Sequence, residues 1–310
     1  MNAADYLQRI RYTGSRTPDS VTLAALHRAH LLAVPFENLD IHLGRPITLD
    51  LPSRYAKIVT RRRGGFCYEL NGLFAWLLAQ LGYDVTLLSA GVYGGDGRPG
   101  PEYDHLTLLV RAPGDPTPWL ADVGFGEGFR EPLRLDVAGE QTRNGRGYRV
   151  EAPAISGPLS PWERDGVRVL NPGAAPQTLT PPLPEGEVED GPHPLAPSPL
   201  VGEGRGEGIW RYFEADREGG WRARYWFTLA PREYGEFAEM CRWQQTSPDS
   251  HFTRNRLCSL ATPQGRVTLA DMTLIETERG ERRETPVAAA AEYQRLLRDR
   301  FGVDPALGSS

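Results

Sequence analysis

Three residues whose types can cooperate in nucleophilic catalysis stand in the first half of this 310-residue chain: Cys67, His105 and Asp122. A cysteine thiolate is a strong nucleophile, an imidazole can accept the thiol proton, and a carboxylate can orient the imidazole and favour its charged form. The chain has three cysteines and six histidines, and a single residue of either type more often fills a core or a surface position. Their places on the predicted elements therefore decide whether they can act together.

Cys67 stands where a predicted helix begins. Apolar residues follow it at the 3.6-residue period of one helix face, and Gly82 occupies the position of a terminating glycine. The unpaired N–H groups and the positive end of the helix dipole favour a thiolate at this position. Two glycines precede the thiol, Gly64 and Gly65, and they allow a bound group to approach backbone donors that could hold a developing oxyanion.

His105 and Asp122 stand on two β-rich runs that flank a turn centred near residue 115. If the two runs pair as an antiparallel hairpin, residue 105 lies opposite roughly residue 125. The two side chains are then at the same end of the hairpin, close enough to touch. Arg63, beside the predicted turn before Cys67, could favour the thiolate or pair with Glu69, and we interpret it as a structural ion pair.

The elements that must position these residues change in type along the chain. Residues 1–83 read as helices, with Asp19 or Ser20 as a cap, and several short strands with turn-forming loops follow from residue 84, which predicts an antiparallel sheet or barrel. Between residues 151 and 210 there are 12 Pro and 9 Gly, so an insert is predicted at about 153–207, at the tip of a hairpin. A last helix is expected between Thr285, as its cap, and Gly302.

Composition excludes several classes of function. The net charge is −5, which gives no sign of nucleic-acid binding, and no apolar run is long enough for a membrane span. The N-terminal residues carry polar and charged groups throughout, so we expect no signal peptide. Three cysteines without a CxxC pair argue against a disulfide framework and against a metal site. The expected location is the cytoplasm.

Several segments together resemble the arylamine N-acetyltransferase family. They are Val34-Pro35-Phe36-Glu37-Asn38-Leu39, Arg63-Gly64-Gly65-Phe66-Cys67-Tyr68-Glu69-Leu70-Asn71, Asp122-Val123-Gly124-Phe125-Gly126, Phe227-Thr228-Leu229-Ala230-Pro231-Arg232, Gln245-Thr246-Ser247-Pro248 and Leu257-Cys258-Ser259-Leu260. The resemblance covers about residues 5–150 and 209–280. The Arg-Gly-Gly-x-Cys and Asp-Val-Gly-Phe-Gly segments occur in this order, and a predicted strand that carries His105 lies between them. Together these features are specific for the family.

The resemblance implies an α+β fold with a cysteine-protease-like Cys-His-Asp arrangement. An N-terminal helical bundle carrying the nucleophile would span residues 1–83. An antiparallel β-barrel, which contains the insert, would span residues 84–230, and a C-terminal α/β lid would span residues 231–310. The triad positions of the family are matched by Cys67, His105 and Asp122. The implied reaction transfers an acetyl group from acetyl-CoA to an arylamine or arylhydrazine, through an acetyl-cysteine and with ping-pong kinetics.

The resemblance also suggests which residues contact the substrates. Gly124, Phe125 and Gly126 would lie against the CoA thioester, and Phe36 and Phe125 would form an aromatic wall for the flat amine. Phe36 is equally well explained as a core residue, since it lies within an apolar run. We expect no metal, and partners limited to the amine and the thioester, with no nucleic acid or membrane. The sequence leaves the oligomeric state open.

Three other functions remain open from the sequence. A related amide synthase would take a carrier-bound or longer acyl thioester in place of acetyl-CoA. Transglutaminase-like and papain-type proteases also use the order Cys, His, Asp, although the segment around Cys67 argues against them. A catalytically impaired binding scaffold is the third possibility, if the insert has damaged the fold.

Overall fold

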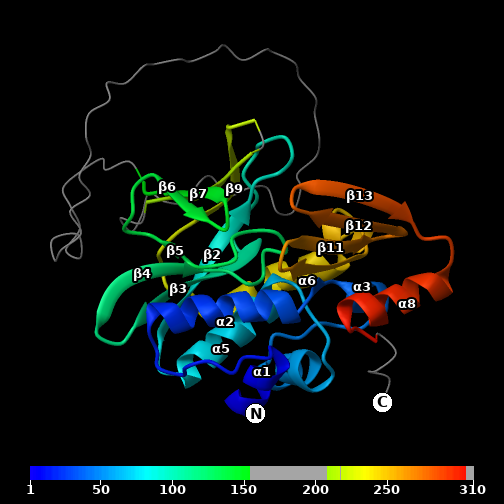
Figure 1. The fold of residues 1–310 in the computed structure, drawn as a ribbon, viewed down its shortest axis with the longest axis horizontal. Coiled ribbons are helices and arrows are strands. Elements are labelled where there is room, and N and C mark those ends of the chain that lie inside the picture. Colours follow the sequence, from blue (N-terminus) through cyan, green and yellow to red (C-terminus); the bar gives the residue numbers. More distant parts are fainter. Residues whose placement is uncertain (154–207, 217, 305–310) are drawn as a thin grey trace.

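The computed structural model describes residues 1–153, 208–216 and 218–304. Two sheets lie next to each other above the N-terminal helices α1 and α2 in the view of Figure 1: a larger one in cyan, green and yellow, and a smaller one in orange with a red helix beside it. The N-terminal elements are α1 (Ala3–Arg9), α2 (Ser20–Ala33), β1 (Phe36–Glu37), α3 (Leu39–His42), α4 (Leu51–Tyr55), the π-helical turn η1 (Ala56–Thr60) and α5 (Cys67–Gln80).

Local sequence signals explain the two main N-terminal helices. Asp19 caps α2 by accepting a hydrogen bond from the backbone N–H of Thr22, 2.7 Å away, as the sequence predicted. The helix α5 begins at Cys67, and Gly82 follows its end with φ +95°, a backbone conformation that favours glycine. The apolar face of α5 is completely buried, so this helix forms the centre of the core.

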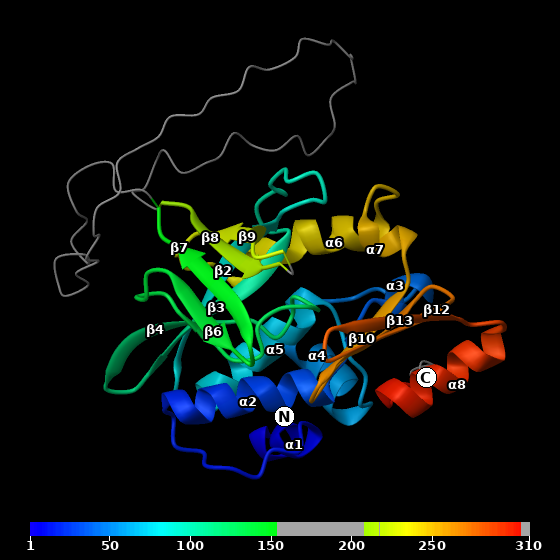
Figure 2. The same cartoon turned by 45° about the horizontal axis from the view of Figure 1, so that its top comes forward.

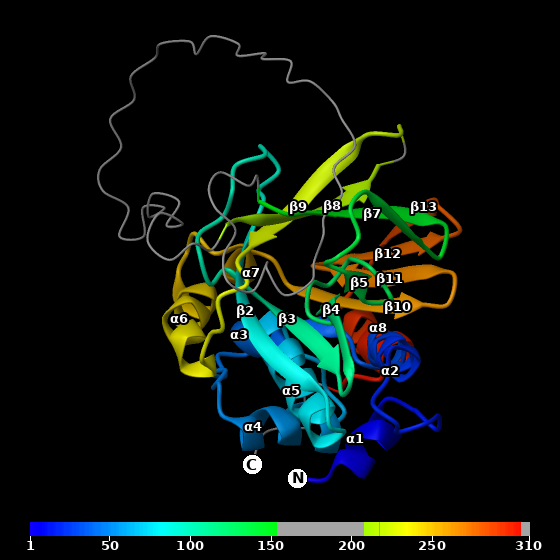
Figure 3. The same cartoon turned by 90° about the vertical axis from the view of Figure 1, so that its left-hand side faces the viewer.

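The larger sheet has eight strands in the order β5-β4-β3-β2-β9-β8-β7-β6, all antiparallel. Their bounds are β2 (Asp84–Val92), β3 (His105–Ala112), β4 (Asp115–Ala121), β5 (Leu133–Arg134), β6 (Glu140–Arg143), β7 (Arg146–Glu151), β8 (Trp210–Ala215) and β9 (Trp221–Phe227). In Figure 3 the strands β7, β8 and β9 arch above β2, β3 and β4. The sheet is thus strongly curved, as a barrel requires.

A side chain joins the two edge strands of this sheet. Gln141 on β6 accepts a hydrogen bond from the backbone N–H of Arg134 on β5 at 2.9 Å and donates one to its carbonyl oxygen at 2.7 Å. The barrel is therefore nearly closed, with a glutamine side chain in place of a backbone ladder. The strands β7 and β8 pair from Tyr148 with Glu214 to Glu151 with Arg211, so they form the predicted hairpin. The predicted insert at its tip lies outside the described residues.

The C-terminal part combines three helical segments, a sheet and a final helix. The elements are η3 (Tyr234–Phe237, a 3-10 helix), α6 (Ala238–Thr246), α7 (His251–Arg254), β10 (Leu257–Thr262), β11 (Gly265–Ala270), β12 (Thr273–Glu278), β13 (Glu281–Pro286) and α8 (Ala290–Phe301). Figure 2 shows α6 and α7 on the opposite side of the molecule from α2. Among the described residues, no helix is both long enough and apolar enough to cross a membrane.

Two predictions about elements were wrong in detail. Residues 1–83 are not helical throughout, because Phe36 and Glu37 form β1, which pairs with Ser259 and Cys258 of the C-terminal sheet. The last helix does not begin at Thr285, which pairs with Leu274 as part of β13. The helix α8 starts at residue 290, since pairing across the sheet outweighs the local capping signal, and it ends at Gly302 as predicted.

Candidate active site

Cys67 is the first residue of α5, and its side chain is buried, with 3% of the residue exposed. Burial raises the pKa of the Cys67 thiol well above its usual range, the nearby carboxylate of Asp104 acts in the same direction, and a backbone hydrogen bond from Leu106 opposes both. Burial therefore opposes the effect of the helix terminus, which the sequence analysis expected to favour a thiolate at Cys67. A thiolate at Cys67 needs a partner that takes the proton and carries the countercharge.

His105 and Asp122 touch, as the hairpin register predicted. Nε2 of His105 lies 2.7 Å from Oδ2 of Asp122, and both residues are buried. Burial by itself would raise the pKa of Asp122, but His105 and the hydrogen bonds to the carboxylate lower it. Asp122 therefore stays ionised, and the bond through Nε2 leaves Nδ1 as the imidazole nitrogen available to another partner.

Asn71, one turn after Cys67 on α5, holds this arrangement together. Its amide nitrogen donates to Oδ1 of Asp122 at 2.8 Å and to the carbonyl oxygen of Leu106 at 2.6 Å. Its amide oxygen accepts a hydrogen bond from the backbone N–H of Val123 at 2.8 Å. A single side chain thus connects the helix of the nucleophile to β3, which begins at His105, and to Asp122 and Val123, which directly follow β4. The spacing of four residues from Cys67 places Asn71 on the same helix face, a signal that the sequence analysis did not use.

His27 holds the backbone of Asp122. Its Nε2 accepts a hydrogen bond from the backbone N–H of Asp122 at 3.1 Å, and its Nδ1 contacts the carbonyl oxygen of Arg130 at 3.0 Å. Because Nε2 accepts, the ring is neutral and its proton is on Nδ1. Burial lowers the pKa of His27 to about 4, so this neutral form persists near pH 7. His27 is a satisfied core residue.

The turn before Cys67 is shaped by its two glycines. A Cβ on Gly64 would overlap the carbonyl oxygen of Pro35, and a Cβ on Gly65 would lie 2.7 Å from a carboxylate oxygen of Glu69. That carboxylate accepts a hydrogen bond from the backbone N–H of Phe66 at 3.2 Å and so caps α5. Gly64 is required by close backbone packing, and Gly65 leaves room for the carboxylate that caps α5, in both cases independently of any ligand.

A buried network of charges holds the same turn. Arg63 donates to Glu37 at 2.8 Å and to Asp40 at 3.0 Å, and Lys57 contacts Asp40 at 2.8 Å and Glu69 at 2.9 Å. Arg63 is thus a structural ion pair, but its predicted partner was wrong, because Glu69 pairs with Lys57. The cause is the strand β1, which brings Glu37 to Arg63 from outside the local segment.

The loop after Asp122 lies directly on the nucleophile. A Cβ on Gly124 would stand 2.8 Å from the Cα atom of Cys67, and a Cβ on Gly126 would stand 3.4 Å from the ring of Phe36. Phe36 is 7% exposed, so its side chain belongs to the core. The ring of Phe125 is partly exposed and packs edge-on against His105, with 5.3 Å between the ring centroids.

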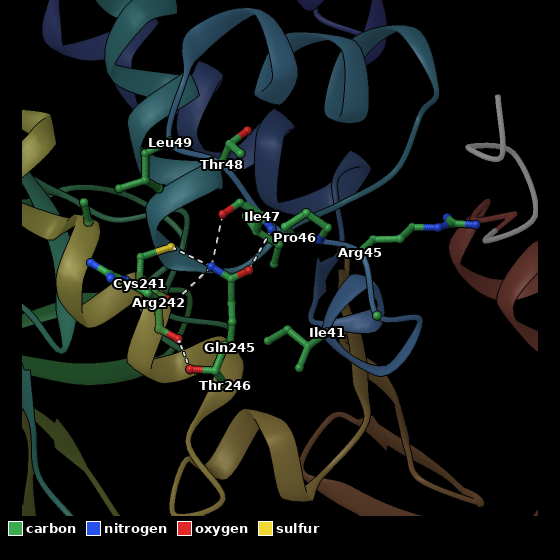
Figure 4. Close-up of a pocket in the computed structure, with 12 residues that line it drawn as sticks. Ile41, Arg45, Pro46, Ile47, Thr48, Leu49, Cys241, Arg242, Gln245 and Thr246 are labelled. Carbon is green, nitrogen blue, oxygen red and sulfur yellow. Dashed lines mark hydrogen bonds between the residues drawn. The ribbon is translucent and has the colours of Figure 1, made fainter.

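A surface groove of about 550 Å³ lies away from these residues, between the segment 44–49 and α6. Figure 4 shows Gln245 at its centre, hydrogen-bonded to the backbone of Ile47 and to Cys241. None of Cys67, His105 and Asp122 lines the groove, so we do not assign it as the active site in spite of its size. Among the described residues, no group of three or more His, Cys, Asp or Glu side chains is arranged to hold a metal ion.

Comparison with known proteins bears on this geometry. A family model described as N-acetyltransferase matches residues 19–156 and 173–307. The liver isozyme of arylamine N-acetyltransferase from Gallus gallus is 30% identical over 313 residues, which cover 98% of this chain and 96% of the relative. The chain belongs to the arylamine N-acetyltransferase family. The arylamine N-acetyltransferase of Mycolicibacterium smegmatis is also 30% identical, over 98% of this chain and 92% of its own length.

Solved structures of arylamine N-acetyltransferases share the fold. The enzyme from Mycobacterium marinum in complex with CoA superposes with a TM-score of 0.76 at 28% identity, and the match covers 100% of this chain and 95% of that one. The resemblance seen in the sequence is thus confirmed, and so is the combination of helices with a nearly closed eight-stranded barrel. As a member of this family of acyltransferases, the protein is an enzyme that transfers acetyl groups.

Proposed function

We propose that the protein transfers the acetyl group of acetyl-CoA to the nitrogen of an arylamine or arylhydrazine, through an acetyl-Cys67 intermediate. The contact of 2.7 Å between His105 and Asp122 carries the proposal, together with the backbone hydrogen bond that Leu106, the residue after His105, makes to the Cys67 thiol. It supplies a proton acceptor held by an ionised carboxylate beside a buried thiol, which is the set that a cysteine acyltransferase needs.

In the first half-reaction, His105 takes the Cys67 proton on Nδ1 while Asp122 stabilises the imidazolium. The thiolate attacks the thioester carbonyl, the C–S bond to CoA breaks, and the CoA thiolate leaves with the proton that His105 returns. Thioester exchange is nearly balanced in free energy, so a thiolate suits this step. Gly124, Phe125 and Gly126 would line the approach of the thioester, because the absence of side chains at the two glycines leaves room beside Cys67.

In the second half-reaction, the amine nitrogen attacks the acetyl carbon and the C–S bond to Cys67 breaks. His105 takes the excess amine proton, and the products are the amide and the free enzyme. The partly exposed Phe125 ring is the proposed wall for the flat amine, with Phe36 beneath Gly126 as its buried support. One site serves both half-reactions, so ping-pong kinetics are expected.

The test is the intact mass of the protein after incubation with acetyl-CoA alone. We expect a gain of one acetyl group on the wild type and on the matched variant Cys241→Ala, because Cys241 is also buried but has no histidine partner in the described structure. The Cys67→Ala variant should gain none, and an added arylamine should remove the group from the wild type.

The alternatives predict different results in the same experiment. A folded wild type that gains no acetyl group, but gains an acyl group from a longer or carrier-bound thioester, would indicate the amide-synthase function. A folded protein that reacts with no thioester would indicate a binding scaffold, and turnover of a peptide substrate would indicate a protease. Each of these outcomes contradicts the proposed acetyl transfer.

A further inference from the structure

The start of β3 lies along the first turn of α5. The hydroxyl of Tyr68, the residue after Cys67, donates to the carbonyl oxygen of Asp104 at 3.3 Å. The backbone of Leu106 forms a hydrogen bond with the thiol of Cys67. Contacts on both sides of His105 thus bring this histidine to the nucleophile, and the side chain of Asp104, which directly precedes it, comes with it.

The carboxylate of Asp104 is held at both of its oxygens. Oδ1 accepts a hydrogen bond from Nε2 of Gln244 on α6 at 2.6 Å, and Oδ2 accepts one from the backbone N–H of Val92 at 3.2 Å. The amide of Gln244 is itself oriented by Ser250, whose hydroxyl donates to Oε1 at 2.8 Å, and both of these residues are buried. N–H donors on both oxygens favour the ionised carboxylate. Asp104 therefore carries a negative charge in a position that α6 fixes.

The charge of Asp104 acts on both members of the reacting pair. Burial raises the pKa of Asp104, whereas its hydrogen bonds and the nearby His105 lower it, and among the described residues no lysine or arginine pairs with it. In return, a negative charge beside an imidazole favours the imidazolium. After burial, Asp104 contributes most to the raised pKa of the Cys67 thiol. One carboxylate therefore favours the charged form of the histidine and disfavours the thiolate.

Most groups that face the pair from the other elements are neutral. Asp122, which follows β4, touches His105 directly and is the carboxylate of the triad. Further ionisable side chains that act on Cys67 or contact His105 are Tyr68 on α5, Tyr225 on β9, Tyr234 on η3 and Cys241 on α6. Burial raises the pKa of each of these four, so they carry no charge near pH 7. Among these groups, the charges are those of Asp104 and Asp122.

We propose that Asp104, held by Gln244, is a positioning residue that sets the pH range in which Cys67 and His105 form a thiolate–imidazolium pair. The inference rests on the proposed function and adds to it a residue outside the triad. The pair forms above an acid limit, where the thiol loses its proton, and disappears above a basic limit, where the imidazolium loses its own; both limits belong to the pair. A nearby negative charge raises both limits, so Asp104 moves the whole range to higher pH.

The experiment replaces Asp104 with asparagine, which has nearly the same shape and no charge. In Asp104→Asn we expect both limits to move to lower pH by about one unit, because the negative charge beside the pair is lost. The acid limit is the midpoint of Cys67 alkylation by iodoacetamide, followed by peptide mass between pH 4 and pH 10. The basic limit is the pH at which the rate of acetyl-Cys67 formation declines, since His105 must protonate the leaving CoA thiolate.

The matched control is Asp84→Asn, which removes the same charge from an exposed position on β2. Asp84 precedes Ala90, the strand partner of His105, by six residues, about 20 Å along the strand, so both limits should stay at the wild-type pH. Asp104→Glu keeps the charge and should also keep both limits near those of the wild type. If Asp104→Asn fails to fold because its amide meets the N–H of Val92, Asp104→Ser, whose hydroxyl can accept, should show the same shift.

Two results would overturn this role of Asp104. One is a folded Asp104→Asn or Asp104→Ser variant whose limits stay at the wild-type pH or rise, since a merely structural role would change the melting temperature or the maximal rate and leave the limits in place. The other is an equal shift in Asp104→Glu, which would exclude the charge as the cause. The acetyl adduct on Cys67 is measured for every variant. Its absence from the wild type counts against the proposed function, whereas its presence with unmoved limits counts against Asp104 alone.

Discussion

Nδ2 of Asn71 lies 2.8 Å from Oδ1 of Asp122, so the helix that carries the thiol also holds the carboxylate that contacts His105. The same amide group bonds the backbone of Leu106 on β3 and of Val123, just after the end of β4. The relative positions of α5, β3 and β4 at the site therefore depend on one buried side chain, and this dependence can be tested.

The variant Asn71→Ala should lower both stability and acetylation. It leaves the carbonyl oxygen of Leu106 and the N–H of Val123 buried without partners, which costs about 1–3 kcal/mol for each group. Asp122 also loses one of the donors that hold it toward His105. Thermal unfolding and the rate of acetyl-Cys67 formation measure the two effects. A variant that melts like the wild type and acetylates at the same rate would show that Asn71 has no positioning role.

The thiol of Cys67 should depend on His105 for its reactivity below the pH at which a buried thiol ionises. Burial raises the pKa of this thiol, so in His105→Gln the thiolate should form only at high pH. The alkylation of Cys67 by iodoacetamide, followed by peptide mass between pH 5 and pH 10, should then continue to rise with pH where the wild type has levelled off.

At pH 7 the rate in His105→Gln is expected to fall by about 10²–10⁴-fold, the usual contribution of a positioned base. Cys241 and Cys258, which are also buried thiols, provide an internal control in the same samples. Superimposable profiles for wild type and variant would argue that His105 does not take the Cys67 proton.

Gly124→Ala should separate the loop from the nucleophile. The added Cβ would stand 2.8 Å from the Cα atom of Cys67 and 3.0 Å from its carbonyl oxygen, and these backbone atoms cannot move without shifting α5. We expect a loss of about 1–3 kcal/mol in unfolding free energy and slower acetylation. The control is Gly235→Ala, since a Cβ there would meet nothing within 4 Å. Equal effects of the two substitutions would contradict the close packing of loop and helix.

The sequence was sufficient to predict the parts of the site that local signals specify. The period of the apolar residues and Gly82 defined α5, and the turn between two β-rich runs placed His105 near Asp122. The paired residues Leu108 and Ala121 lie within one residue of the register expected from the turn, although the pairing shifts between Val110 and Ala112. A short hairpin leaves little freedom for slippage, so the contact at its open end could be predicted approximately. The family resemblance then supplied the barrel.

The remaining parts depend on contacts between distant segments, which one sequence does not reveal. Arg63 meets Glu37 because a two-residue strand pairs with β10, more than 200 residues later in the chain. The sequence around Thr285 is typical of a helix cap, but in the structure Thr285 pairs with Leu274 of β12. The burial that raises the pKa of Cys67 likewise results from packing against other elements, whereas the helix dipole that favours a thiolate could be inferred locally.

His27 should make the stability of the protein depend on pH in a defined direction. The pKa of its side chain is about 4 in the folded state and near 6.5 in an unfolded chain, so below pH 6.5 the unfolded chain binds a proton that the folded protein does not. The free energy of unfolding should therefore fall as the pH is lowered from 6.5 toward 4, by up to about 3 kcal/mol from this residue. His30, whose pKa is also lowered by burial, acts in the same sense.

Urea unfolding at several pH values between 4 and 7 would measure this dependence. His27→Gln removes one titrating group from the unfolded state, so the decline of stability with acid should be shallower than in the wild type, whatever the stability at pH 7. His42→Gln is the matched control, because it makes the same substitution at an exposed histidine outside the core. Parallel curves for wild type and His27→Gln would mean that His27 is protonated in the folded protein, and Nε2 could then not accept the hydrogen bond from Asp122.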